Sequence, residues 1–149
     1  MSRPPESLRI DFEPFLDDGL RTFITDGVDH HNIAKTGLAA YFPTHFILRA
    51  DRGEVMGGLL GLIWGSWLHI TILWVADTAR GQGHGGRLLE AAEAYALERG
   101  CIGVFLDTFS FQARPFYEGH GYRVFGTLAD CPPGHESYFL MKRLDQPDQ

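Results

Sequence analysis

The chain has few cysteines, no long apolar run and no excess of basic residues, and each shortage excludes a class of protein. Only two cysteines occur among 149 residues, and Cys101 and Cys131 form neither a C-x-x-C pair nor a zinc-ligand spacing. A disulfide framework is therefore not expected, whereas a reducing compartment is. Ser66 and His69 interrupt the most apolar stretch, and residues 1–14 lack an apolar signal segment. We predict a soluble, cytoplasmic protein without a membrane partner.

Basic side chains are outnumbered by acidic ones. The chain has 13 Lys and Arg against 19 Asp and Glu, a net charge of −6. Nucleic-acid binding needs clustered Lys and Arg to contact phosphates, so nucleic acid is not expected as a partner. Hydrophobic residues make up 44% of the sequence and aromatic residues 13%, which suffices for one buried core in a chain of this length. We predict a single domain over residues 1–149.

The spacing of apolar residues predicts an α+β fold. Residues 8–12 are expected to form a short strand, and a helix from Glu13 is expected to end near Gly27, while residues 30–44 could be a broken second helix or a long loop. Strands are then predicted at 45–50, 55–64, 67–75, 101–108, 122–128 and 136–144, with helices at 85–99 and 112–120. Runs of strands with few helices indicate α+β, with one strand–helix–strand crossover in the middle.

A glycine-rich loop separates the third of these hairpin strands from the helix that follows it. Four glycines fall within the six residues from Gly81 to Gly86. Such a loop before a helix can present backbone N–H groups to a phosphate. A Walker A reading fails, because Arg87 and Leu88 replace the Lys and Ser/Thr that reach phosphate and magnesium.

A dinucleotide-binding loop is a second alternative. Gly81, Gly83 and Gly86 satisfy G-x-G-x-x-G, and Asp107 follows at a suitable distance. However, residues 76–80 separate the strand from the first glycine, and the loop follows antiparallel strands, whereas a Rossmann loop closes the first strand of a parallel sheet directly. A third alternative is a glycine-rich helix cap that binds no ligand.

Two spaced motifs resemble those of the GNAT N-acetyltransferase superfamily. Arg80, Gly83 and Gly85 form R-x-x-G-x-G, similar to the acyl-CoA-binding signature Q/R-x-x-G-x-G/A. Residues 110–124, SFQARPFYEGHGYRV, are similar to the family segment N-x-x-A-x-x-F/L-Y-x-x-x-G-F/Y, with Ser110 where the family often has Asn. The resemblance covers residues 46–143 and implies an acetyl-CoA-binding core there, preceded by an acceptor-side helical segment at 1–45.

The resemblance also implies a mixed, mostly antiparallel sheet of about six to seven strands flanked by about four helices. It implies acetyl-CoA as co-substrate and direct transfer of the acetyl group to an amine in a ternary complex, with no metal. The residues that it assigns to cofactor binding lie on the third strand, in the loop and around the later motif: Leu73, Trp74, Val75, Arg80, Gly81, Gln82, Gly83, His84, Gly85, Gly86, Arg87, Ser110 and Phe116.

Two catalytic residues are predicted. Tyr117 matches the family's usual acid for the leaving thiolate, although a packed core aromatic is the alternative. Many family members carry a glutamate base on the third strand, and this sequence has none. Strand alternation would place Trp67, His69, Thr71, Leu73 and Val75 on one face, so His69 is the leading base candidate. A packed or surface histidine, with a water chain through Thr71 or backbone carbonyls as the base, stays equally open.

The acceptor is the least determined part. Adjacent His30 and His31 do not suit one metal ion, and no set of Cys or carboxylates completes a site. Six acidic residues lie in the segment from Asp11 to Thr36, which favours a cationic amine if they rim the acceptor site and is otherwise a solvated helix face; they are Asp11, Glu13, Asp17, Asp18, Asp26 and Asp29. We predict an N-acetyltransferase acting on a primary amine of a small, cationic acceptor. A catalytically silent CoA-binding module, protein N-termini or lysines as acceptors, and a homodimer remain alternatives.

Overall fold

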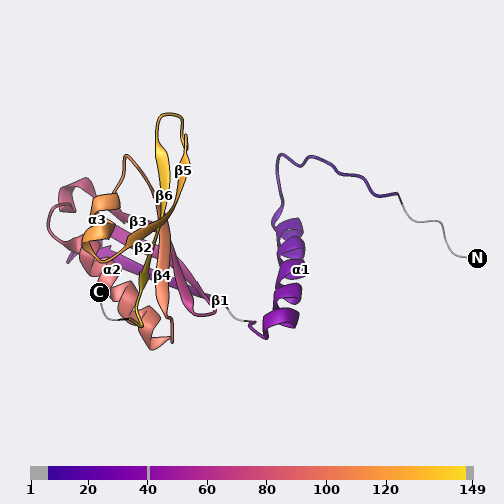
Figure 1. The fold of residues 1–149 in the computed structure, drawn as a ribbon, viewed down its shortest axis with the longest axis horizontal. Helices are drawn as coiled ribbons and strands as arrows, with labels where there is room; N and C mark the ends of the chain where they lie inside the picture. The colour runs from indigo at the N-terminus through magenta and orange to yellow at the C-terminus, as the bar shows by residue number, and fades with distance from the viewer. Residues whose placement is uncertain (1–6, 40, 147–149) are drawn as a thin grey trace, which may run out of the picture. The chain divides into compact units, whose positions relative to one another are not determined.

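The computed structural model describes residues 7–39 and 41–146, and the chain divides into two compact units, Met1–Ala39 and Ala40–Gln149. The first unit contains one helix, α1 (Asp18–Thr36), drawn in purple in Figure 1. Asp17 caps its N-terminus by accepting a hydrogen bond from the Leu20 N–H at 2.9 Å. At its C-terminus, Gly37 adopts a left-handed φ of 72° and its N–H bonds to the Ile33 carbonyl.

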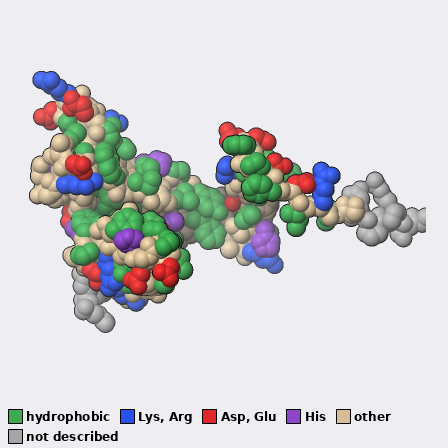
Figure 2. Space-filling model, turned by 90° about the horizontal axis from the view of Figure 1, so that it is seen from above, with side chains coloured by type: hydrophobic (Ala, Val, Ile, Leu, Met, Phe, Trp, Pro, Cys, Tyr) green, Lys and Arg blue, Asp and Glu red, His purple; other side chains and the backbone are tan. Residues whose placement is uncertain are grey.

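The prediction that this helix ends near Gly27 is wrong. A glycine inside a helix costs only about 1 kcal/mol relative to alanine, and here the helix is capped well at both ends. Residues 8–12, expected to form a strand, are not in a strand. Hydrophobic and acidic side chains lie side by side at the surface of this unit (Figure 2), and Phe23 has an exposed fraction of 77%.

The second unit is built on a six-stranded mixed sheet with the strand order β1-β2-β3-β4-β6-β5. Every neighbouring pair is antiparallel except β3 with β4. The strands are β1 (Tyr41–Arg49), β2 (Val55–Trp64), β3 (Trp67–Val75), β4 (Gly103–Phe109), β5 (Arg123–Ala129) and β6 (Glu136–Arg143), and the helices are η1 (Asp77–Ala79), α2 (His84–Glu98) and α3 (Arg114–Gly119). The predicted α+β fold is confirmed. Three α-helices occur in the described residues instead of about four, because the chain from Asp18 to Thr36 forms one helix.

The core lies between α2 and one face of the sheet. The buried helix residues Leu89, Ala92 and Ala96 are fully enclosed, and the core they belong to includes buried residues of β2, β3 and β4 and partly buried residues of β1. Small residues on the helix let it approach the sheet closely. This arrangement fixes the N-terminus of α2, and therefore the glycine-rich loop, at the end of β3. No helix within the described residues is both long and apolar enough to cross a bilayer.

Strands β3 and β4 pair over only a short length. Trp67, Leu68 and His69 lie opposite Gly103, Val104 and Phe105 in the register, and no pair follows them in the sheet. From Ile70 onward, β3 therefore keeps β2 as its neighbour but leaves β4. The two strands separate toward their C-terminal ends, and Figure 1 shows β3 and β4 at the middle of the sheet, with α2 and α3 nearby.

A β-bulge interrupts β3 at Thr71. Leu60 of β2 pairs with Ile72 whereas Gly61 pairs with Ile70, so Thr71 is the extra residue. Its hydroxyl donates a hydrogen bond to the Leu60 carbonyl at 3.1 Å. A glycine is needed opposite, because a Cβ on Gly61 would lie 2.8 Å from the His69 carbonyl oxygen.

Candidate active site

A pocket of about 780 Å³ opens where β3 and β4 separate. Its volume is within the usual range for small-molecule sites, about 300–1,000 Å³. Four segments line it: the second half of β3, the loop before α2, the end of β4 and the segment through α3. The lining residues are Ile70–Val75, Ala79–Gly81, Gly83–Gly86, Leu106–Thr108, Phe111–Ala113, Phe116 and Tyr117.

Gly81 and Gly83 give the loop its shape. Their φ angles are 73° and 82°, in the left-handed region that side-chain-bearing residues rarely adopt. A Cβ on either glycine would meet no atom within 4 Å, so both face open space beside the pocket. Gly83 is the N-cap of α2 and supplies no side-chain cap. The first N–H groups of α2 therefore keep no intrahelical partner, and together with the positive end of the helix dipole they form a site that fits a phosphate or pyrophosphate.

Gly85 and Gly86 serve packing instead. A Cβ on Gly85 would lie 3.3 Å from the Phe116 ring, and one on Gly86 would lie 2.9 Å from the His120 ring. These two glycines let the start of α2 approach α3 closely, so the four glycines divide into two that shape the anion site and two that hold α3 beside it.

The polar side chains of the loop bind within the protein. Arg80 lines the pocket, but its Nε donates to the Val75 carbonyl at 2.9 Å and its Nη1 pairs with Asp77 at 2.8 Å. Its guanidinium thus ties the loop to the end of β3. Arg87 contacts His84 Nδ1 at 3.1 Å. Of the loop residues predicted to bind cofactor, Gln82 and Arg87 lie outside the pocket lining, and their cofactor contacts stay predictions.

Tyr117 lines the pocket and lies on α3. Only 7% of it is exposed, and it packs edge-on against Phe116 and Tyr122. Burial, and secondly the negative charge of Asp107, raise the pKa of its hydroxyl to about 12. The hydroxyl makes no hydrogen bond in the part of the chain that the structure describes. Among the same residues, Trp64 Nε1 is the one side-chain polar atom that is both fully enclosed and without a partner. The Tyr117 hydroxyl oxygen is therefore not fully enclosed. The Tyr117 hydroxyl is therefore reachable from the pocket.

Ser110 is turned away from the pocket. Its hydroxyl accepts a hydrogen bond from the Glu136 N–H at 3.1 Å and lies 3.3 Å from His135 Nδ1, and it is not among the lining residues. The nearby amide side chain of Gln112 lines the pocket instead, held by the Phe109 N–H at 2.9 Å. Sequence reasoning missed Gln112. A cofactor contact by Ser110 stays a prediction.

The bulge overturns the predicted alternation along β3. Leu73 and Val75 pack against the same core as Leu68 and Ile70. His69 therefore lies on the opposite face from Leu73 and Val75, and the prediction of one shared face is wrong, because Thr71 adds a residue and shifts the alternation. His69 does not line the pocket; its ring stacks on Phe105 with centroids 4.4 Å apart.

Metal ligation has no candidate within the described ranges, since no three His, Cys, Asp or Glu side chains there are grouped to hold an ion. Among the acidic residues of the first unit, Asp17 caps α1 and Asp11 pairs with Arg9 at 2.9 Å. Local structure accounts for these two carboxylates, and a role of this segment in acceptor binding stays a prediction.

Comparisons with known proteins identify the family. The Acetyltransferase (GNAT) family model matches residues 8–122. The chain is 48% identical over 95 residues to a blasticidin-S acetyltransferase from Streptomyces morookaense, which covers 63% of this chain and 70% of that protein. It is 34% identical over 121 residues to an acetyltransferase from Agrobacterium fabrum, which covers 81% and 88%.

The same relationship holds among solved structures. The crystal structure of an acetyltransferase from Bacillus cereus aligns with a TM-score of 0.78 at 33% identity, over 90% of this chain and 98% of that one. The alternative of a nucleotide-binding Rossmann or Walker A protein is thereby excluded. The chain belongs to the GNAT family and is an acetyltransferase whose acyl donor is acetyl-CoA.

Proposed function

We propose that the protein transfers the acetyl group of acetyl-CoA to a primary amine of a small, cationic acceptor by direct attack in a ternary complex. The observation that carries this proposal is the pocket between β3 and β4, which joins an anion-binding loop to the reachable hydroxyl of Tyr117. A relative that is 48% identical is a blasticidin-S acetyltransferase, and blasticidin S is therefore the first acceptor to test.

Acetyl-CoA fits the pocket in one direction. The N-terminus of α2 with Gly81 and Gly83 would hold the pyrophosphate, because unpaired N–H groups and a helix dipole favour anions there. Beyond His69, β3 has no paired strand on the β4 side, although the Val75 carbonyl already accepts a hydrogen bond from Arg80 Nε. The remaining unpaired N–H and C=O groups need hydrogen-bonding partners, and the amide-bearing pantetheine arm would supply them. The thioester then lies toward Tyr117.

The reaction needs three proton movements. The acceptor ammonium loses a proton to a base, and the neutral amine attacks the thioester carbonyl carbon. A C–N bond forms as the C–S bond breaks, and the thiolate takes a proton from a donor. The nitrogen gives up its second proton, which restores the donor, and the products are the acetylated amine and CoA as the free thiol. Tyr117 is the proposed donor of the proton that the thiolate takes. Because the pKa of its hydroxyl is raised to about 12, Tyr117 carries its proton throughout the neutral range.

His69 remains the proposed base. It lies on the sheet face opposite α2, at the last residue pair before β3 and β4 separate. An acceptor entering from that face would pass its imidazole, directly or through a water molecule. The other route considered, through Thr71, is weakened because the Thr71 hydroxyl already donates its proton to the Leu60 carbonyl.

The test is an acetylation assay that follows the release of free CoA thiol. Blasticidin S and a panel of primary amines, including a peptide with a free N-terminus and a lysine side chain, are incubated with acetyl-CoA and the purified protein. We expect thiol release and an acetylated product by mass spectrometry with blasticidin S or another small cationic amine. Faster acetylation of the peptide than of every small amine would overturn the proposed acceptor class, and no release above hydrolysis would overturn the proposed function.

A further inference from the structure

We propose that Asp107 binds the ammonium group of the acceptor and holds it in front of the thioester at the opening between β3 and β4. This inference rests on the proposed function, since it assigns the acceptor subsite of the same pocket. It goes beyond the glycine loop and Tyr117, because neither of them offers a negative charge to a cationic substrate.

The position of Asp107 follows from the register of β4. Phe105 is the last β4 residue paired with β3, and Asp107 lies two residues further along the strand, beyond the point of separation. Val104, Leu106 and Thr108 are buried toward α2 and α3, so Asp107 faces the other side of the sheet together with Phe105. Asp107 is exposed and lines the pocket.

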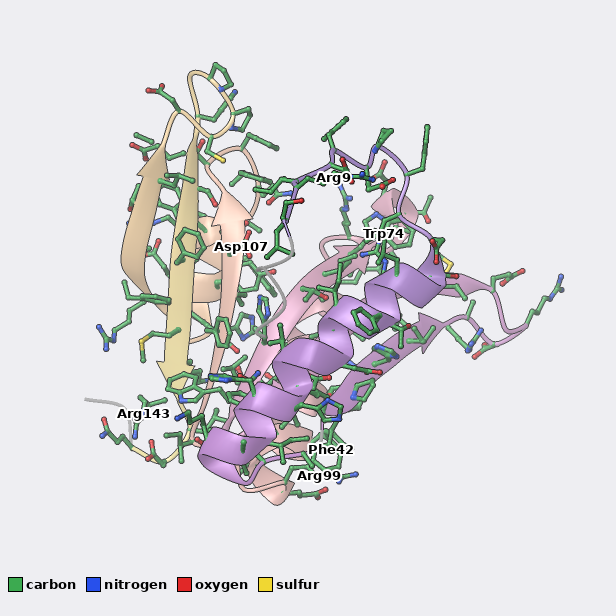
Figure 3. The ribbon with its side chains drawn as sticks, turned by 90° about the vertical axis from the view of Figure 1, so that its right-hand side faces the viewer. Arg9, Phe42, Trp74, Arg99, Asp107 and Arg143 are labelled. Carbon is green, nitrogen blue, oxygen red and sulfur yellow. The ribbon has the colours of Figure 1, made fainter. Side chains whose placement is uncertain are left out.

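The opposite wall of the opening comes from β3. After the bulge, Trp74 lies on the same face of the sheet as His69, is 50% exposed and also lines the pocket. Figure 3 shows Asp107 on β4 and Trp74 on the neighbouring β3, toward the same end of the two strands. A carboxylate and the face or edge of an indole are both favourable neighbours for an alkylammonium group. The opening thus provides a place for a cation on the face of the sheet that α2 does not cover.

The carboxylate of Asp107 is free to bind a cation. It is the single carboxylate among the residues that line this pocket. Within the described residues, no hydrogen bond or ion pair engages it, in contrast to Asp77, whose carboxylate pairs with Arg80. The contacts of Asp107 therefore give it no role in stabilising the fold, and its carboxylate lies exposed at the pocket.

The pocket links Asp107 to the proposed acid. The negative charge of Asp107 contributes to the raised pKa of the Tyr117 hydroxyl, which is an effect that charges exert on nearby groups. An ammonium held by Asp107 is therefore within electrostatic reach of the atom that would protonate the leaving thiolate. This juxtaposition is what a ternary complex requires.

The experiment uses Asp107→Asn, which removes the charge and keeps the side-chain shape, with Asp107→Glu as the conservative variant. Glu98→Gln is the matched control, because Glu98 is exposed at the end of α2, lies outside the pocket and loses the same charge. Turnover is measured with blasticidin S. Binding of blasticidin S and of 1,5-diaminopentane to the CoA-saturated protein is measured by calorimetry, which does not depend on turnover.

For Asp107→Asn, we expect the KM for the acceptor and the Kd of a bound amine to rise about tenfold or more, the loss typical of one hydrogen bond to a charged group. The KM for acetyl-CoA should stay as in the parent protein, and Asp107→Glu should retain part of the affinity. The pKa of Tyr117, followed by tyrosinate absorbance against Tyr117→Phe, should fall in Asp107→Asn and not in Glu98→Gln.

These measurements distinguish a failure of the Asp107 assignment from a failure of the proposed function. Unchanged amine binding in Asp107→Asn would overturn the assignment of Asp107 even if the parent protein acetylates blasticidin S. Absence of amine binding to the CoA-saturated parent would overturn it as well. Tight, Asp107-dependent amine binding without any thiol release would instead support the subsite and contradict the proposed function.

Discussion

Replacing Gly83 with alanine tests whether the loop holds a phosphate or only caps α2. Gly83 has a φ of 82°, and a Cβ there would meet no protein atom within 4 Å. The folded protein should therefore lose only the cost of a left-handed alanine, about 1–2 kcal/mol. The added methyl group would project into the open space beside the N-terminus of α2, where the pyrophosphate is proposed to lie. We expect at least a tenfold loss of CoA affinity.

Gly100→Ala is a matched control for Gly83→Ala. Gly100 has a φ of 80°, also faces open space, and lies at the other end of α2. Both variants should lower the free energy of unfolding equally. At a CoA concentration of 100 times the parent Kd, ligand stabilisation is about 2.7 kcal/mol, and a tenfold weaker Kd reduces it to about 1.4 kcal/mol. Urea unfolding with and without CoA measures this, with NADH as a ligand expected to stabilise neither. Equal CoA stabilisation of the two variants would refute the phosphate site.

Three further outcomes are expected. Tyr117→Phe should slow the chemical step about 10²-fold or more with little change in the KM for acetyl-CoA, measured by pre-steady-state thiol release, and an unchanged rate would remove the acid role. Because the pKa of the Tyr117 hydroxyl is raised to about 12, the free energy of unfolding should be constant in this respect below pH 10 and should fall by about 3 kcal/mol as the pH rises toward 12. Tyr117→Phe should show a flatter pH dependence of the free energy of unfolding. Glu93→Gln should lower the free energy of unfolding by about 3 kcal/mol, because it removes the negative charge that pairs with the largely buried Lys142 at 3.0 Å. Urea unfolding that shows no loss would mean that this ion pair does not stabilise the fold.

The sequence was sufficient where the determinants are local. A glycine-rich loop followed by a helix is a pattern contained within a few residues, and the helix predicted at 85–99 is confirmed as His84–Glu98. Leu73, Trp74 and Val75 line the pocket, and their contacts with the cofactor stay predictions.

The rest depends on contacts between distant residues. The bulge at Thr71 arises where Gly61 of β2 lies against the His69 carbonyl, and no sequence pattern within residues 67–75 predicts it. A regular alternation therefore placed His69 on the wrong face relative to Leu73. The sequence relates Asp107 only to the dinucleotide-binding pattern, because its position at the opening depends on where β4 leaves β3, which is a property of the sheet and not of the strand's own sequence.

The raised pKa of Tyr117 and the free carboxylate of Asp107 are best understood together. A tyrosine hydroxyl with a pKa of about 12 stays protonated at neutral pH. The same high pKa makes proton transfer to a thiolate unfavourable, because the corresponding thiol has a pKa near 8.5 in model compounds. The negative charge of Asp107 contributes to the raised pKa of Tyr117. An ammonium group on Asp107 would neutralise this charge, lower the pKa of Tyr117 and make proton donation easier only when an acceptor is present. Under the proposals above, the acceptor subsite and the acid are coupled, so acetyl-CoA bound without an acceptor faces the less reactive form of Tyr117.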